Sequence, residues 1–138
     1  MKNSCSFCDF NEDRKLKESK HAFVIFSNPR LMPGHLLVVS KRHIQRLSQM
    51  TKDERGEVLD FVTEFEEKIL AKLPKGCDIR QNFKPYVENS RTHVNHFHFH
   101  LHPREFDDEL HEKTDVYIKP LYKDLPKEEK ERLFKLLK

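Results

Sequence analysis

The sequence has few of the features that mark membrane-spanning or disulfide-rich proteins. No apolar run approaches the ~18 residues that a membrane helix requires, and 36% of the 138 residues are charged. Cysteine is scarce: there are three, one of which stands alone, and this favours a reducing cytoplasm over a disulfide scaffold. The opening Met1-Lys2-Asn3-Ser4 lacks a cleavable signal pattern. We therefore expect a cytoplasmic protein with no membrane partner.

A marked excess of one charge is also missing. The chain has 26 Lys and Arg against 23 Asp and Glu, a formal net charge of +3, and its lysines are interspersed with acids. This balance does not call for a nucleic-acid partner. No internal repeat or low-complexity segment divides the chain. We expect a single domain over residues 1–138, with a core of about residues 5–106 and a C-terminal extension of residues 107–138.

The hydrophobic pattern predicts an α+β domain. Strands are expected over residues 22–26, 36–39 and 77–83, with a polar loop over residues 84–91. Thr51 opens the clearest helix, because Glu54 three residues later completes a capping box. Apolar residues then recur at helical spacing and are expected to pack in the core, namely Val58, Phe61, Val62, Phe65, Ile69 and Leu73.

Other segments give weaker patterns. Residues 9–20 are highly charged and suggest a loop or an irregular hairpin. Val116-Tyr117-Ile118 suggests a short strand within an otherwise unclassified segment. A final helix is expected from Pro126, because acidic residues come early and lysines late, which matches the helix dipole.

The most informative segment is residues 92–104, THVNHFHFHLHPR. Four histidines, at positions 96, 98, 100 and 102, alternate with apolar residues. Successive side chains of a strand point to opposite faces, so one face carries imidazoles about 6.6–6.8 Å apart and the other is apolar. The internal position excludes an affinity tag. Incidental histidines on a half-exposed strand would explain one or two of these residues, whereas four in register indicate a site for anions or metal.

His98 is the candidate nucleophile of this ladder. An imidazole attacks only when neutral, and its ordinary pKa of about 6.5 leaves much of it neutral near pH 7. Attack through one ring nitrogen requires the other to hold its proton against a carbonyl or carboxylate. His96 and His100 flank His98 on the same face and can donate hydrogen bonds to phosphate oxygens. The pattern therefore predicts attack on a phosphorus centre held between them.

Cys5 and Cys8 form a Cys-x-x-Cys pair, which is half of a tetrahedral zinc site. Taken alone, the pair is equally compatible with a redox function or with two small core residues. Cys77 lies near a predicted strand and is expected to be a small core residue.

Three segments, in this order, resemble the histidine triad (HIT) family, and in particular bacterial nucleotide hydrolases similar to diadenosine polyphosphate hydrolases. The Cys5–Cys8 opening is similar to that of many bacterial members. Residues 31–43, LMPGHLLVVSKRH, look like the family's Pro-Gly-His strand. The ladder with the following Pro103 and Arg104 resembles the family signature, although His102 stands where a hydrophobic residue is usual. The resemblance covers residues 5 to about 104 and implies an antiparallel sheet of about five strands, one long helix and a C-terminal helix.

The resemblance also implies roles. His98 attacks the α-phosphate of a nucleotide ester or anhydride, and water then cleaves the nucleotidyl-histidine. His35 and His100 bind phosphate, together with His96 on the same face. A homodimer, an adenine-nucleotide substrate and no organic cofactor are expected. Structural Zn²⁺ is implied with Cys5, Cys8, His43 and His96 as ligands, a full set that leaves no open position for catalysis.

Two departures from the family pattern bear on substrate binding. Thr92 stands where the family commonly has Gln against phosphate, and it follows Arg91. Ser27, with Asn28 beside it, falls where an acid or amide usually contacts ribose. Thr92, Ser27 and Asn28 are kept as candidate substrate-binding residues, and we expect Gln81 and Asn82 to offer amides to the phosphates from the neighbouring strand.

Two classes of function follow. The first is a phosphohydrolase or nucleotidyl transferase that cleaves at the α-phosphate of dinucleoside polyphosphates or nucleoside phosphoramidates. The alternative is a non-catalytic nucleotide-binding regulatory module, a hypothesis that the loss of the usual Gln keeps open. A nucleic-acid end processor would need a basic surface or an added binding domain, and neither is evident in the sequence.

Overall fold

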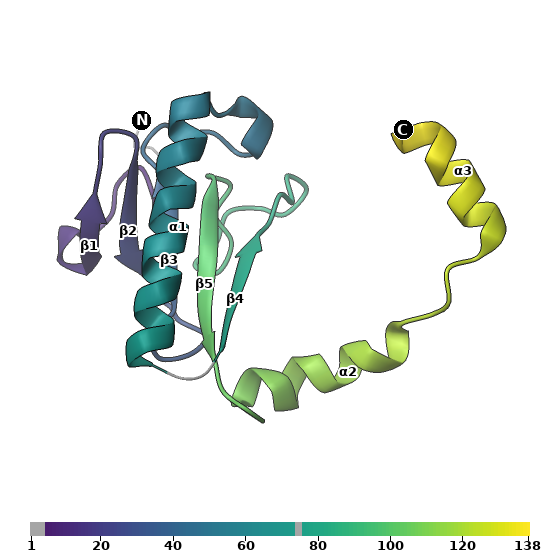
Figure 1. Cartoon of the computed structure of the whole chain (residues 1–138). Helices are drawn as coiled ribbons and strands as arrows, with labels where there is room; N and C mark the ends of the chain where they lie inside the picture. The colour runs from purple at the N-terminus through teal and green to yellow at the C-terminus, as the bar shows by residue number, and fades with distance from the viewer. Residues whose placement is uncertain (1–4, 74–75) are drawn as a thin grey trace. The chain divides into compact units, whose positions relative to one another are not determined.

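The computed structural model describes residues 5–73 and 76–138. They form two compact units, one ending at Phe106 and the other comprising Asp107–Lys138. The first unit holds a five-stranded antiparallel sheet in the order β1-β2-β3-β5-β4, with helix α1 across one face (Figure 1). The predicted α+β architecture is confirmed. Its elements are β1 (Lys15–Glu18), β2 (Ala22–Phe26), β3 (Leu36–Ser40), α1 (Lys52–Lys72), β4 (Gly76–Gln81) and β5 (His98–Arg104).

Helix α1 begins as the capping box predicts. Thr51 Oγ1 accepts a hydrogen bond from the Glu54 amide (3.1 Å), and the Glu54 carboxylate accepts one from the Thr51 amide (2.9 Å). Its apolar stripe packs against the sheet residues that face it, and this cluster includes Val58, Phe61, Val62, Phe65, Ile69, Val24, Val38, Phe97 and Leu101. The apolar face of the histidine-bearing strand is therefore anchored in the main core. The expectation for Leu73 is wrong, because this residue lies just after the helix and is half exposed.

The buried Glu54 carboxylate also receives hydrogen bonds from Arg42 Nη2 (2.8 Å) and Nε (3.2 Å). Chiefly because of the hydrogen bonding from Arg42, the pKa of Glu54 falls from 4.5 to about 2. A carboxyl whose pKa is lowered in the fold stabilises it above the unfolded pKa, and this contribution is lost as the pH falls toward the folded value. Glu54 therefore links the segment before α1 to the helix at neutral pH.

We expect Glu54→Gln to lower the free energy of unfolding by about 1–2 kcal/mol at pH 7 and by clearly less at pH 3. Urea denaturation at the two pH values measures the difference. Asp53→Asn, at an exposed residue of the same turn, is the matched control. It should lower the free energy of unfolding by about 0.5 kcal/mol. Equal losses for Glu54→Gln at both pH values would contradict the assignment.

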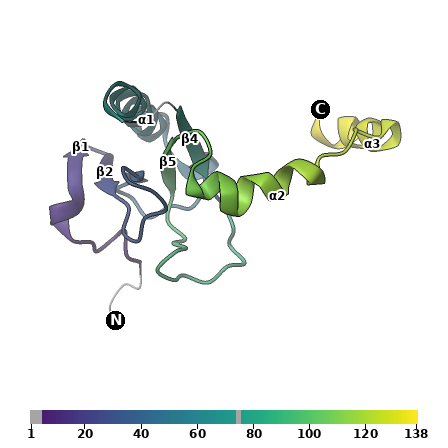
Figure 2. The same ribbon diagram turned by 90° about the horizontal axis from the view of Figure 1, so that it is seen from below.

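The opposite face of the sheet carries a second apolar cluster, and the histidine ladder lies on this same face. This cluster contains Cys5, Phe7, Phe23, Ile25, Leu37 and Val39. In the register of β3 and β5, Leu37 pairs with His100 and Val39 with His98, so these side chains share the face away from α1. Figure 2 shows α1 on one side of the sheet and the connection from β4 to β5 on the other.

The charged segment of residues 9–20 is an irregular hairpin arm, one of the two forms expected for it. A short 3₁₀ helix (Glu12–Arg14) precedes β1, and the pairing of β1 with β2 shifts register between Lys15 and Lys17. A further 3₁₀ helix, Leu47–Gln49, precedes α1.

In the second unit, the strand predicted for residues 116–118 is wrong, because this segment is helical. A π-helix (His111–Asp115), α2 (Val116–Ile118) and a 3₁₀ turn (Lys119–Leu121) follow one another. Within the described part of this unit no strand is present to pair with the segment, so its backbone is satisfied locally. The final helix, α3 (Lys127–Leu137), follows Pro126 as predicted. Over all described residues, no helix is long and apolar enough to cross a membrane.

Candidate active site and metal-binding cluster

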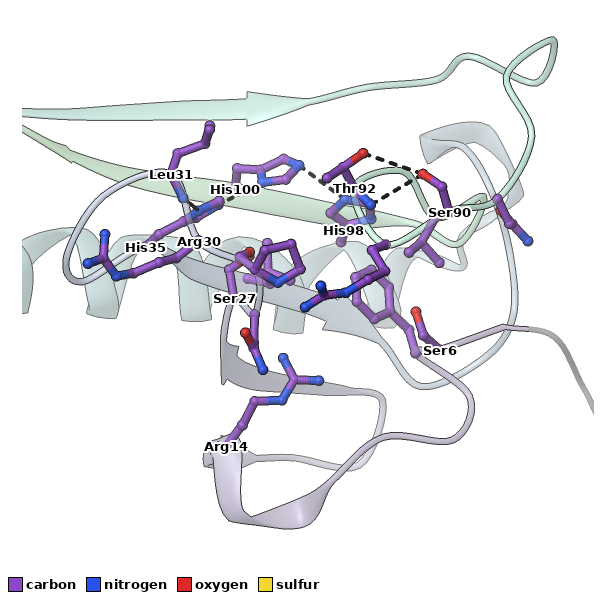
Figure 3. A pocket seen from close by; sticks show the side chains of 17 residues that line it. Ser6, Arg14, Ser27, Arg30, Leu31, His35, Ser90, Thr92, His98 and His100 are labelled. Atoms are coloured by element: carbon purple, nitrogen blue, oxygen red, sulfur yellow. Dashed lines mark hydrogen bonds between the residues drawn. The ribbon is translucent and has the colours of Figure 1, made fainter. Parts of the chain in front are cut away.

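A pocket of about 710 Å³ opens on the sheet face away from α1. His98 and His100 reach it from β5, and His35 reaches it from the residue before β3 (Figure 3). The loop after β2 and the β4–β5 connection supply other walls, including Ser27 and Thr92. The expected alternation of the ladder thus places two of its imidazoles on one wall of a cavity.

Hydrogen bonds join these rings into a directed chain, which we call the relay. The Leu31 amide donates to His35 Nδ1 (3.1 Å), so His35 carries its proton on Nε2 and donates it to His100 Nδ1 (2.9 Å). His100 Nε2 then donates to His98 Nε2 (3.1 Å). His98 Nδ1 donates to the carbonyl of His96 (2.6 Å). A backbone amide at one end and a backbone carbonyl at the other thereby fix the tautomers of the rings between them.

The relay leaves His98 in the form that attack requires. Its Nδ1 proton is held by a carbonyl, and its Nε2 lone pair accepts only a neighbouring imidazole N–H. Phe7 packs edge-on against the ring, with centroids 4.8 Å apart, and so limits its rotation.

Burial keeps the relay uncharged. Removal from water penalises an imidazolium, and this lowers the pKa of His98, that of His35 to about 4 and that of His100 to about 2. Neighbouring histidines lower each of these values further. Burial therefore favours the neutral form of the His98 ring near pH 7.

His35 is positioned by the preceding glycine. Gly34 has φ +82°, and a Cβ placed there would lie 2.8 Å from Leu73 Cδ1 and 3.1 Å from Pro103 Cγ. This combination of a left-handed backbone and close neighbours explains the Pro-Gly-His turn physically. The carbonyl of His35 in turn accepts a hydrogen bond from the Ser27 amide (2.9 Å). This bond connects the turn to the opposite pocket wall.

We expect Gly34→Ala to destabilise the fold by about 1–3 kcal/mol, because it adds both backbone strain and a steric clash. Gly56→Ala is the matched control, since this glycine lies within α1 and a Cβ there meets nothing within 4 Å. The Gly56→Ala change should raise the free energy of unfolding by up to about 1 kcal/mol. Thermal denaturation measures both, and a stabilising effect of Gly34→Ala would contradict the argument.

A second cluster brings Cys5, Cys8, His43 and His96 together. His96 Nδ1 lies 3.3 Å from Cys5 Sγ, 3.5 Å from Cys8 Sγ and 3.1 Å from His43 Nδ1, and Cys8 Sγ lies 3.3 Å from His43 Nδ1. Ligands of a tetrahedral zinc ion, at about 2.3 Å for sulfur and 2.0–2.1 Å for nitrogen, stand roughly 3.3–3.8 Å apart. The four residues are compatible with zinc in both chemistry and spacing.

The tautomer of His96 supports the same fit. Its Nε2 donates to the Ser40 carbonyl (2.6 Å), which leaves the Nδ1 lone pair directed at the thiols and His43. A carbonyl behind a ligating histidine is the usual arrangement in metal sites.

The predicted substrate-binding residues fall into two groups. Ser27, Asn28 and Thr92 line the pocket with His35, His98 and His100. Gln81 and Asn82 do not: Gln81 pairs with Phe99, on the α1 side of the sheet, and its amide donates to the Asn82 carbonyl (2.9 Å). Nor does His96 line the pocket, because both of its ring nitrogens are engaged in the cysteine cluster and by Ser40.

His102 is buried on the ladder face, edge-on to His35 with ring centroids 4.5 Å apart. Its Nε2 has no hydrogen-bond partner within the described residues. His35, His100 and His102 bring ring nitrogens within 4.8 Å of one another. The relay already uses both nitrogens of His35 and of His100, however, so this trio lacks the free lone pairs of a metal site.

Sequence reasoning missed several pocket residues. Phe7, which packs against His98, lies between Cys5 and Cys8, so the sequence pattern alone does not distinguish it from the Cys-x-x-Cys pair. Arg91, already noted in the sequence beside Thr92, lines the pocket. Arg14, at the end of the 3₁₀ helix Glu12–Arg14, and Arg30, in the loop after β2, line it as well and were missed. Only their charge singles them out in the sequence, and the chain has many other basic residues.

Comparison with known proteins agrees with this geometry. The HIT domain model matches residues 10–107, and the chain belongs to the HIT family. An uncharacterized HIT-like protein of Methanocaldococcus jannaschii is 36% identical over 109 residues, which are 72% of this chain and 78% of that protein. The resemblance seen in the sequence is confirmed.

Two further similarities extend the comparison. Galactose-1-phosphate uridylyltransferase of Thermotoga maritima is 27% identical over 114 residues, 77% of this chain but 35% of the relative, so the chain spans about a third of that protein. The crystal structure of a zinc-bound histidine triad family protein from Mycobacterium smegmatis has a TM-score of 0.64 at 21% identity, covering 78% of this chain and 79% of that one, and it supports the fold. The family includes nucleotide-binding proteins, hydrolases and transferases.

Proposed function

We propose that this protein is a nucleotide hydrolase or nucleotidyl transferase. In this proposal it cleaves at the α-phosphate of dinucleoside polyphosphates or nucleoside phosphoramidates through a nucleotidyl-His98 intermediate. The observation that carries the proposal is the relay, which leaves a neutral His98 with its Nε2 lone pair on the pocket wall. Similarity to a uridylyltransferase, named for moving a nucleotidyl group, supports the reaction class.

The chemistry follows from the tautomer. Nε2 of His98 forms a bond to the α-phosphorus as the bond from phosphorus to the leaving oxygen or nitrogen breaks, and the leaving group departs with the electron pair. The ring becomes a phosphorylated imidazolium, whose Nδ1–H the His96 carbonyl continues to accept. Water or another acceptor then attacks phosphorus and releases neutral His98, while the proton of the water passes to solvent.

His35 and His100 are the proposed phosphate donors. Each carries its ring proton on Nε2, and that proton is used inside the relay until a phosphate oxygen takes its place. Such preoriented donors contribute most where charge accumulates on the non-bridging oxygens of the transition state. Thr92, Ser27 and Asn28 are proposed as further contacts from the surrounding loops.

We also propose that Cys5, Cys8, His43 and His96 hold a structural zinc ion. The fit of their spacing supports this, as does the zinc-bound fold relative from Mycobacterium smegmatis. When bound, the ion would cross-link the N-terminal segment to the start of β5. With four protein ligands it would have no open position for water.

Three narrower features complete the proposal. We propose an adenine nucleotide as the substrate and a homodimer as the functional assembly, by resemblance to the family, with a reducing cytoplasm as the location. None of Cys5, Cys8 and Cys77 forms a disulfide bond, which is compatible with that compartment. Sedimentation equilibrium measures the assembly, and a monomer at micromolar concentration would remove the dimer from the proposal.

Intact-protein mass spectrometry tests the reaction. The protein is quenched in mild alkali, which preserves phosphorus–nitrogen bonds, after incubation with diadenosine tetraphosphate or adenosine 5′-phosphoramidate. We expect an added adenylyl group on the intact protein, located after digestion on the peptide that contains His98. AMP should be among the products. A non-catalytic nucleotide-binding module would bind the same compounds with neither adduct nor product, and that result would replace the enzyme by the alternative.

A further inference from the structure

The pocket carries more positive charge than one reactive phosphate requires. Arg14, Arg30 and Arg91 line it, and no Asp or Glu is among its lining residues. In the described parts of the chain these arginines form no ion pair, whereas two other arginines pair with Glu54 and Asp78. Arginines left without a carboxylate around a pocket indicate a ligand with several anionic groups.

Arg14 lies on the far side of the pocket from the nucleophile. Its Nη1 donates to the carbonyl of Phe26, at the end of β2 (2.8 Å), which fixes the position of the guanidinium. β3 lies between β2 and β5, so about 10 Å separates this carbonyl from the ladder strand. Figure 3 shows Arg14 at the lower edge of the group of side chains around the pocket and His98 in its upper part. One phosphate group cannot contact both.

The walls between these two ends suit an uncharged ligand body. Leu37 lies there, on β3 between β2 and β5, and Phe7, Leu31, Val94 and Pro29 also line the pocket. An aromatic and aliphatic lining of this kind accepts a base and sugar better than it accepts a continuous chain of phosphates.

The two residues that follow Phe26, Ser27 and Asn28, also line the pocket. Ser27 directly follows Phe26, and its hydroxyl donates to the Pro29 carbonyl (2.8 Å). With that proton engaged and no carboxylate among the described lining residues, this end of the pocket offers the amide of Asn28 and the guanidinium of Arg14. A guanidinium presents a planar fork of donors that matches a phosphate.

We propose that the pocket selects nucleotides that carry a second phosphate on the sugar, the class of nucleoside 3′,5′- or 2′,5′-bisphosphates. The reactive 5′-phosphorus lies at His98, and Arg14 holds the sugar phosphate. The inference rests on the proposed function for the placement of the first phosphate. It extends that function by naming a charged substituent on the part of the substrate that stays bound to the enzyme.

Isothermal titration calorimetry with AMP, ADP, adenosine 3′,5′-bisphosphate and adenosine 2′,5′-bisphosphate tests the inference. We expect at least one bisphosphate to bind about 10- to 100-fold more tightly than AMP. Arg14→Gln should remove this gain and leave the AMP affinity unchanged, which also reports that the variant is folded. Arg14→Lys should retain part of the gain, and Arg132→Gln, in α3, is the matched control that should change nothing.

The outcomes separate the two proposals. If AMP binds and His98 becomes adenylylated while neither bisphosphate gains over AMP, the inference fails and the proposed function stands. If ADP gains as much as the bisphosphates and Arg14→Gln removes both gains, Arg14 binds a linear phosphate chain and the inference is overturned. If no nucleotide binds and no adduct forms, the proposed function fails and the inference fails with it.

Discussion

Replacing His98 by alanine is expected to reduce turnover of dinucleoside polyphosphates or nucleoside phosphoramidates by about a thousandfold or more. The substitution removes His98 Nε2, the acceptor at the end of the relay, whose lone pair accepts the His100 N–H at the pocket wall. Without it, the α-phosphate still meets the donors of His35 and His100 but has no protein nucleophile. The adenylyl adduct should disappear together with the turnover. Steady-state product formation and intact mass measure the two effects.

Binding should survive this loss. His98→Asn and His98→Gly keep the phosphate donors, so both variants should bind AMP with an affinity measurable by calorimetry. His111→Ala, at a partly exposed histidine of the second unit, is the control for removal of an imidazole elsewhere and should turn over normally. A His98→Ala protein that hydrolysed substrate at nearly the wild-type rate would rule out the covalent role.

Replacing Cys8 by serine is expected to abolish stoichiometric zinc binding and to lower the melting temperature by about 10 °C. The Cys8 side chain is exposed, so the change removes a ligand without opening a cavity in the core. The loss would come from the cross-link between the N-terminal segment and β5, which the ion completes. Metal analysis of the purified protein and differential scanning calorimetry measure the two effects.

Cys77→Ser is the matched control, because Cys77 lies on β4, outside the cluster, and burial raises the pKa of its thiol to about 11. It should keep its zinc content and lose only a small amount of stability. Wild-type protein that contained less than about a tenth of an equivalent of zinc, without any exposure to chelator, would exclude the structural ion.

Much of this site could be predicted because a strand has a period of two. Alternating histidines and apolar residues determined which face of β5 meets α1, and the structure has Phe97 and Leu101 in the main core. The capping box at Thr51 likewise gave the start of the long helix, since both of its hydrogen bonds are local. Patterns that depend on neighbours in the sequence were therefore reliable guides.

The predictions that were wrong and the features that were missed depend on contacts between segments that are distant in the sequence. The register of β4 against β5 puts Arg80 opposite His100 and turns Gln81 to the α1 side, and sequence spacing does not determine this register. The strand expected at residues 116–118 rested on β propensity, which is weak where no partner strand is available. The relay and the position of Arg14 come from contacts between segments dozens of residues apart, such as His35 with His100.

His96 takes part in both the cysteine cluster and the relay. The ring of His96 faces the two thiols, while the carbonyl of the same residue holds the Nδ1 proton of His98. If His96 were held less firmly, its carbonyl could move away from His98 Nδ1, and the His98 ring could then rotate. If the proposed activity and the proposed zinc ion are both correct, a preparation stripped of metal would then show less activity than the metal-bound protein, even though no substrate contacts the ion.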